Sequence, residues 1–201
     1  MSSCPLILAS ASPRRRELLS SVGIRFSVVP GNAPEEEIPG ETPEEHVIRL
    51  SIDKARDVAF SSRVEGRWFL GSDTIVLRDE DILGKPGDAE EAFAMLQSLS
   101  GRAHQVVSGY ALFDREKGEV KSGAVKTKVN FKELTREEIE GYIATGEPFD
   151  KAGAYAIQGI GAFMVKNIEG SYTNVVGLPL CEVVELLEKA GAAQLFSWEK
   201  E

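Results

Sequence analysis

A short segment near the amino terminus has residue types that could bind phosphate. Residues 5–9 (PLILA) are apolar and predict a short buried strand, and Ser12 followed by Pro13 predicts the start of a helix. The unpaired amides and the dipole of a helix start favour an anion, and Arg14 and Arg15 would add bidentate contacts to a phosphate group. Because arginine at a helix start opposes the dipole, the pattern fits either a bound phosphate or a solvated basic face.

Asp73 lies inside an apolar segment, residues 68–77 (WFLGSDTIVL). Such a segment predicts a central strand that is buried on both faces and interrupted at Gly71 and Asp73. A buried carboxylate needs a hydrogen-bonding partner or a metal. We therefore favour a functional role for Asp73 over the alternative, in which it caps a neighbouring turn.

Three more charged positions are weak signals when each is taken alone. Glu35 belongs to an acidic run, residues 35–37, of the kind that is usually solvated. Lys54 lies late in an amphipathic helix, where its stem could run along the edge of the core. Lys85 lies between a glycine and a proline, which is ordinary turn chemistry.

Small residues are concentrated in the segment 150–159 (DKAGAYAIQG). They allow the backbone either to approach a ligand closely or to form a tight turn. Residues 159–161 lack the third glycine, the preceding strand and the following helix of a dinucleotide-binding motif. The chain also has no P-loop lysine motif and no G-x-S-x-G sequence. It therefore lacks the signatures of P-loop nucleotide-binding proteins and of the nucleophile elbow in α/β-hydrolases.

Composition and charge restrict the class of protein. The 201 residues are 42% hydrophobic and 27% charged, which is enough for a sizeable core and too apolar for bulk disorder. Runs of about 18 apolar residues are absent, so we expect no membrane span. The first nine residues have no basic region and no small-residue cleavage site follows, so we expect no signal peptide. We therefore expect a cytoplasmic protein. The net charge of −9 disfavours nucleic-acid polymers and anionic membranes, but local cations could still hold a small anion.

The chain has two cysteines, Cys4 and Cys181, and two histidines, His46 and His104. Their spacing matches no zinc pattern, so we expect two incidental reduced thiols. Any metal should be a hard cation held by carboxylates. We expect both histidines at the surface or at a helix cap.

The elements that must position these residues alternate along the chain. The expected strands cover residues 5–9, 24–29, 68–77, 106–113, 120–131 and 163–165. Helices are expected after the capping residues Ser12, Thr42, Asp88 and Thr135, and from Pro179 to Gly191. This order predicts an α/β fold with a mixed, twisted sheet and flanking helices, in which one domain, residues 1–201, forms two lobes around a cleft.

Blocks spread from about residue 6 to residue 190 resemble, in order, the Maf family. They are LASASPRRRELL from residue 8, Glu35, Lys54-Ala55, GSDTIV from residue 71, GKP from residue 84, LSG from residue 99, HQV from residue 104, DKAGAY from residue 150, Gln158-Gly159, GSY from residue 170 and VGLP from residue 176. Each block alone is weak, but so many in one order make the resemblance specific.

The resemblance implies a nucleoside triphosphate pyrophosphatase with a fold related to inosine triphosphate pyrophosphatases. It implies a divalent cation, Mg²⁺ or Mn²⁺, with Glu35 and Asp73 as ligands, and often a homodimer. By position, Asp73 matches the proton acceptor of the family. The other active-site positions that it implies are Ser10, Arg14, Arg15, Glu35, Lys54 and Lys85, and the positions that set base choice are Arg14, Thr74 and Gln158.

The segment 150–159 resembles the branch of the family that acts on dTTP and UTP. Pro34-Glu35 stands where the family commonly has an acidic pair, and Glu36 could supply the second carboxylate. Three functions follow from the resemblance: hydrolysis of dTTP and UTP, hydrolysis mainly of modified pyrimidine nucleotides, or non-catalytic nucleotide binding by a regulator of cell division, since the family is linked to septum formation.

Overall fold

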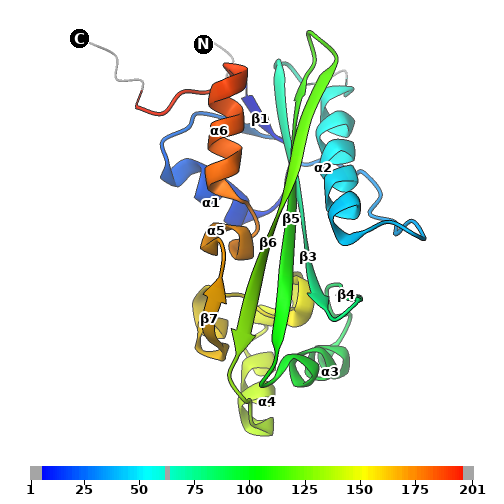
Figure 1. Cartoon of the computed structure of the whole chain (residues 1–201), viewed down its shortest axis with the longest axis vertical. Coiled ribbons are helices and arrows are strands. Elements are labelled where there is room, and N and C mark those ends of the chain that lie inside the picture. The colour runs from blue at the N-terminus through cyan, green and yellow to red at the C-terminus, as the bar shows by residue number, and fades with distance from the viewer. Residues whose placement is uncertain (1–5, 62–63, 197–201) are drawn as a thin grey trace. The chain divides into compact units, whose positions relative to one another are not determined.

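The computed structural model describes residues 6–61 and 64–196 (Figure 1). Two expectations fall outside these residues: the reduced thiol of Cys4, and the first residue, Pro5, of the strand expected over residues 5–9. The strands are β1 (Leu6–Leu8), β2 (Ser27–Val28), β3 (Trp68–Arg78), β4 (Asp81–Leu83), β5 (Ala103–Asp114), β6 (Glu119–Phe131) and β7 (Val165–Glu169). The helices are α1 (Pro13–Ser21), α2 (Pro43–Ala59), α3 (Ala89–Leu99), α4 (Arg136–Ala144), α5 (Tyr172–Val176) and α6 (Leu180–Ala190), with three 3₁₀ segments, Glu147–Asp150, Ala152–Ala154 and Gly159–Met164.

The strands form a seven-stranded mixed sheet with helices beside it, which confirms the predicted α/β fold class. The order is β2-β1-β3-β5-β6-β7, and β4 pairs with β3 outside this path. β1 is parallel to β2 and to β3, whereas β4 is antiparallel to β3 and β7 is antiparallel to β6.

The chain divides into two compact units. The first contains the described residues of Met1–Asp73, Ser108–Val125 and Gly177–Glu201, and the second contains Thr74–Val107 and Lys126–Val176. The single domain over residues 1–201 and the cleft between two lobes stay predictions.

In the first unit, side-chain alternation along β1 and β3 supplies a core on each face of the strands. Leu6, Leu8 and Leu70 belong to the core that α1 and α6 cover, whereas Ile7 and Phe69 belong to the core that α2 covers. Figure 1 shows α2 on one side of these strands and α1 and α6 on the other. The period of two residues therefore directs neighbouring side chains to opposite helical layers.

Two glycines let α2 lie directly on the strands. A Cβ atom at Gly71 in β3 would lie 2.0 Å from the carbonyl oxygen of Ser51, and one at Gly109 in β5 would lie 2.2 Å from that of Val47. The expected interruption of the strand at Gly71 and Asp73 is wrong, because β3 runs unbroken through both residues. Gly71 is needed for the close approach of α2 and not for a break in the strand.

The second unit has its own core, which lies under α3, α4 and the 3₁₀ segments. Its buried side chains include Leu96, Leu99, Phe131, Tyr142 and Met164. The capping box predicted at Thr135 and Glu138 is confirmed by hydrogen bonds in both directions. The short helix α5 was missed by the sequence analysis, and the strand expected over 163–165 is instead β7, which begins at Val165.

Candidate active site

The end of β1 and the start of α1 bring Ser10, Ser12 and Arg15 into contact. Ser12 caps α1, because its Oγ accepts a hydrogen bond from the amide of Arg15 at 3.4 Å. Ser10 is buried, and its Oγ accepts from the amide of Ser12 at 3.2 Å and from Nη1 of Arg15 at 3.4 Å. The predicted helix start is thus confirmed, and the Arg15 side chain folds back toward it.

Arg15 is held in place from a second segment. Its Nε donates to the carbonyl oxygen of Gly177 at 2.8 Å. Burial lowers the pKa of Arg15, the charges of Asp73 and Glu35 oppose that shift, and the charge of Arg14 adds to it. Arg15 is therefore a fixed cation within electrostatic reach of two carboxylates and of a second guanidinium.

Asp73 and Glu35 share one ammonium group. Nζ of Lys54, from α2, lies 2.6 Å from Oδ1 of Asp73 and 2.6 Å from Oε1 of Glu35. Asp73 is only 7% exposed in β3, whereas the Glu35 side chain is 56% exposed in the loop before α2. The prediction that Asp73 is a buried carboxylate with a partner is confirmed, and the partner is Lys54.

Six of the predicted site residues lie in the first unit, around the charged groups just described. They are Ser10, Arg14, Arg15, Glu35, Lys54 and Asp73. Of the two interpretations of Lys54, the ion pairs favour a defined polar role over a stem that merely runs along the edge of the core. The expectation that Glu35 is only a solvated charge is replaced in the same way.

The remaining predicted residues, Thr74, Lys85 and Gln158, belong to the second unit. Thr74 follows Asp73 directly in β3 and is half-buried. Lys85 is exposed just after β4, where the preceding Gly84 carbonyl accepts a hydrogen bond from the amide of Gly153 at 3.0 Å. Gln158 is half-buried and immediately precedes the 3₁₀ segment Gly159–Met164.

The donor set fits a hard cation that is shared with a ligand. Within residues 6–61 and 64–196, no three His, Cys, Asp or Glu side chains are grouped as a metal site. Two carboxylates nevertheless converge on a cation, the Lys54 ammonium. Because Mg²⁺ in phosphate-binding enzymes often takes only one or two carboxylates and completes its shell with phosphate oxygens and water, Glu35 and Asp73 are a suitable pair.

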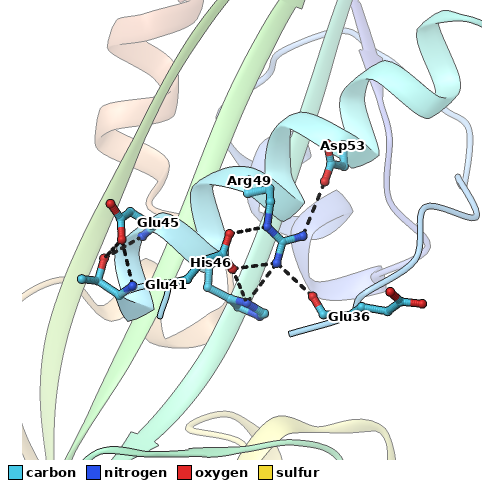
Figure 2. A network of polar contacts seen from close by, with 7 residues as sticks. Glu36, Glu41, Glu45, His46, Arg49 and Asp53 are labelled. Carbon is cyan, nitrogen blue, oxygen red and sulfur yellow. Dashed lines mark hydrogen bonds and ion pairs between the residues drawn. The ribbon is translucent and has the colours of Figure 1, made fainter. Parts of the chain in front are cut away.

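An adjacent polar network on α2 was not predicted from the sequence. Figure 2 shows Arg49 between Glu41, Glu36 and Asp53, with His46 beside them. Oε1 of Glu41 lies 2.5 Å from Nε of Arg49, and Oε2 lies 2.8 Å from Nη2. Hydrogen bonding to Glu41 raises the pKa of Arg49, and hydrogen bonding to Arg49 lowers the pKa of Glu41. The one available signal was that Arg49 lies on the same predicted helix as Lys54.

Both histidine expectations are wrong, because both rings are buried. Nδ1 of His46 lies 3.4 Å from Oε2 of Glu41. Nε2 of His104 lies 2.7 Å from the hydroxyl of Tyr155, and the ring packs edge-on against Phe131. Burial lowers the pKa of His104 to about 4. Its neighbours come from distant parts of the chain, so local sequence could not reveal its position.

The fold and the charged cluster define an α/β protein with a buried acid beside a basic helix start. Comparison with known proteins agrees with this class and gives the family. The family of Maf-like proteins matches residues 5–190. This chain belongs to the Maf-like family.

Several relatives are similar over nearly their whole length. The chain is 66% identical over 195 residues to the dTTP/UTP pyrophosphatase of Syntrophotalea carbinolica, covering 97% of this chain and 89% of that protein. It is 60% identical over 192 residues to the dTTP/UTP pyrophosphatase of a Geobacter species, strain M21, covering 96% and 98%. It is 53% identical over 186 residues to that of Myxococcus xanthus, covering 92% of each chain.

None of the helices in the described part of the chain is both long enough and apolar enough to span a membrane.

Proposed function

We propose that this chain is a nucleoside triphosphate pyrophosphatase that hydrolyses dTTP and UTP to the monophosphate and pyrophosphate. The observation that carries the proposal is Asp73, a buried carboxylate paired with Lys54 and lying within electrostatic reach of Arg15. The relatives named dTTP/UTP pyrophosphatase support the same substrates. A buried acid beside several cations suits the hydrolysis of a polyphosphate.

The cations bind the triphosphate. Arg14 and Arg15 supply guanidinium groups that match phosphate oxygens in pairs, and the amides at the start of α1 add fixed dipoles. Lys54 and Lys85 supply compact charges that stabilise the negative charge on the leaving pyrophosphate. Ser10 keeps the Arg15 side chain directed at the triphosphate by accepting a hydrogen bond from Nη1 of Arg15.

Asp73 serves as the proton acceptor. The Lys54 ammonium orients its carboxylate, which accepts a proton from the attacking water as the water oxygen bonds to phosphorus. The bond between the α phosphorus and the oxygen that bridges the α and β phosphates breaks, and pyrophosphate leaves with the electron pair of that bond. Glu35 and Asp73 would hold Mg²⁺ or Mn²⁺, which when bound neutralises charge on the phosphate oxygens.

Base choice rests on Arg14, Thr74 and Gln158. The carboxamide of Gln158 has a donor and an acceptor that match the edge of uracil or thymine. A base that leaves such a polar group unpaired is rejected, because an unsatisfied polar group in a closed site is costly. The segment 150–159 that carries Gln158 supports a preference for pyrimidine nucleotides.

A nucleotide panel tests this function. We expect pyrophosphate release from dTTP and UTP with Mg²⁺ or Mn²⁺ and much slower release from dATP, dGTP and dCTP. Faster release from modified pyrimidine nucleotides would shift the assignment to those substrates. Binding of dTTP without any release of pyrophosphate would contradict the enzymatic function and favour a non-catalytic regulator of cell division.

The cellular setting belongs to the same proposal. A cytoplasmic nucleotide pyrophosphatase that acts as a homodimer and influences septum formation fits the family. Size-exclusion chromatography with light scattering measures the dimer directly, and a mass of 21.9 kDa per particle would contradict it.

A further inference from the structure

The loop of residues 30–42, which carries Glu35 into α2, is tied to that helix on both sides of Glu35. Before Glu35, the amide of Asn32 donates to Oδ2 of Asp57 at 2.7 Å. After Glu35, Nη2 of Arg49 donates to the carbonyl oxygen of Glu36 at 2.9 Å. Between these two contacts, Glu35 meets Lys54. One helix therefore fixes the loop at three successive places.

The Arg49 contact is the more strongly built of the two ties. Its guanidinium binds both oxygens of Glu41 in a fork and also reaches the Glu36 carbonyl (Figure 2). Oδ2 of Asp53 lies 3.7 Å from Nη1 of the same guanidinium. The Arg49 and Glu41 side chains are only 24% and 17% exposed. A partly shielded bidentate pair resists solvent competition better than an exposed one.

The other tie depends on a close backbone approach. A Cβ atom at Gly31 would lie 2.6 Å from Oδ2 of Asp57. A side chain at Gly31 would therefore force the Asp57 carboxylate, which accepts from Asn32, to shift. Glycine at this position lets the loop backbone lie against α2.

The stretch of the loop from residue 34 to residue 40 offers no buried apolar side chain. Residues 34–40 are all exposed, including the side chain of Ile38. The start of α2 is already capped by Thr42 and Glu45, so Arg49 is not required for that purpose. The polar contacts with α2 therefore hold this exposed stretch, which contains Glu35.

We propose that Arg49, held by Glu41, is a positioning residue that acts together with the Asn32–Asp57 contact. It holds the loop so that Glu35 meets Lys54, the same ammonium that contacts Asp73. The inference deepens the proposed function, and its link to metal binding rests on Glu35 as a ligand. If the loop is free, only a fraction of the molecules has Glu35 in place. The apparent affinity for a cation then falls by that fraction.

The test uses the full chain with Arg49→Lys, which keeps the charge and loses the fork. Hydrogen exchange of the amides in residues 33–41 should accelerate. The dissociation constant for Mn²⁺ alone, measured by electron paramagnetic resonance without nucleotide, should rise about tenfold. Arg136→Lys, in the exposed pair with Glu140 on α4, is the matched control and should change neither quantity.

A second background separates positioning from general stability. With Glu35→Gln present, adding Arg49→Lys should not weaken Mn²⁺ binding further, because two changes that act through one group are not additive. In the dTTP assay, saturating Mn²⁺ should restore the turnover of Arg49→Lys to within about threefold of wild type, since only the occupied fraction is reduced.

The outcomes are decisive in either direction. Unchanged exchange, unchanged Mn²⁺ affinity in Arg49→Lys, an additive loss in the Glu35→Gln background or a wild type that binds no Mn²⁺ would each overturn the inference. A wild type that binds Mn²⁺ and shows the expected Arg49 effects, but releases no pyrophosphate, would sustain the positioning role and remove the proposed function.

Discussion

At the residue scale, the chemistry depends on Asp73, which is buried and paired with Lys54. We expect Asp73→Asn to lower the turnover of dTTP by about 10²–10⁴-fold, the usual contribution of a general base. The amide keeps the size of the carboxylate but cannot accept the proton. Pyrophosphate release at saturating nucleotide measures the effect.

Asp79→Asn is the control for that substitution. Asp79 lies in the turn between β3 and β4 and pairs with Arg102 at the surface. Its left-handed backbone, with φ of 56°, suits asparagine as well as aspartate. Turnover should stay at the wild-type value, and an equal loss in both variants would remove Asp73 from its role.

His104 gives a prediction about pH. Burial lowers its pKa to about 4, whereas an unfolded histidine titrates near 6.5. Between these values the unfolded chain binds a proton that the folded chain does not, so stability falls as pH falls through this window. We expect a loss of about 2 kcal/mol from pH 7 to pH 5, measured by urea unfolding.

The matched variant for this effect is His104→Gln. Its amide can still bond the hydroxyl of Tyr155 but does not titrate. The variant should be less stable at pH 7 and should lose about 2 kcal/mol less than wild type on acidification. An identical pH dependence in both proteins would show that His104 is not the group responsible.

Local sequence revealed some of these residues and concealed others. Asp73 was predicted because a carboxylate within an apolar strand is a conflict that can be seen without any structure. The burial of His104 and the fork between Arg49 and Glu41 were missed, because both depend on side chains that only the folded chain brings together. The family resemblance placed Glu35 and Lys54 in one active site, but neither it nor their spacing predicted the ion pair between them.

At the element scale, the contact between α2 and β3 determines whether Lys54 reaches Asp73. Gly71→Ala would place a methyl group 2.0 Å from the carbonyl oxygen of Ser51 and 2.9 Å from the amide of Ala55. Backbone atoms cannot turn aside as a side chain can, so we expect a destabilisation of about 3 kcal/mol or more. Thermal and urea unfolding measure it.

Gly141→Ala is the corresponding control within a helix. A Cβ atom at Gly141 in α4 meets nothing within 4 Å, and alanine is the better helix former by about 1 kcal/mol. This variant should be as stable as wild type or more so. A Gly71→Ala protein that matched it would show that α2 can move away from β3 without cost.

Elements with local signals were predicted well. The helix starts at Thr42 and Thr135 follow from reciprocal capping, and the strand pair β5 and β6 follows from alternation on either side of a glycine-containing turn. Helix α5, of five residues, is too short to show a helical period. Strand β2 is only Ser27–Val28, because pairing with β1 defines it rather than its own sequence.

At the scale of the whole molecule, a net charge of −9 coexists with a local group of cations. We expect dTTP with Mn²⁺ to raise the free energy of unfolding of the Asp73→Asn variant by about 3 kcal/mol when the dTTP concentration is one hundred times its dissociation constant. A duplex DNA oligomer at physiological salt should give no shift, because the overall charge repels a long polyanion. Stabilisation by DNA alone would contradict this expectation.

Identification of the products of dTTP hydrolysis by the wild-type chain tests the central claim most directly. The nucleotide is incubated with protein and Mn²⁺, and nucleotides, pyrophosphate and orthophosphate are quantified separately. We predict dTMP and pyrophosphate in equal amounts from the first turnovers onward, with no dTDP. Formation of dTDP and orthophosphate would contradict the account, and so would dTTP that the protein binds but does not hydrolyse.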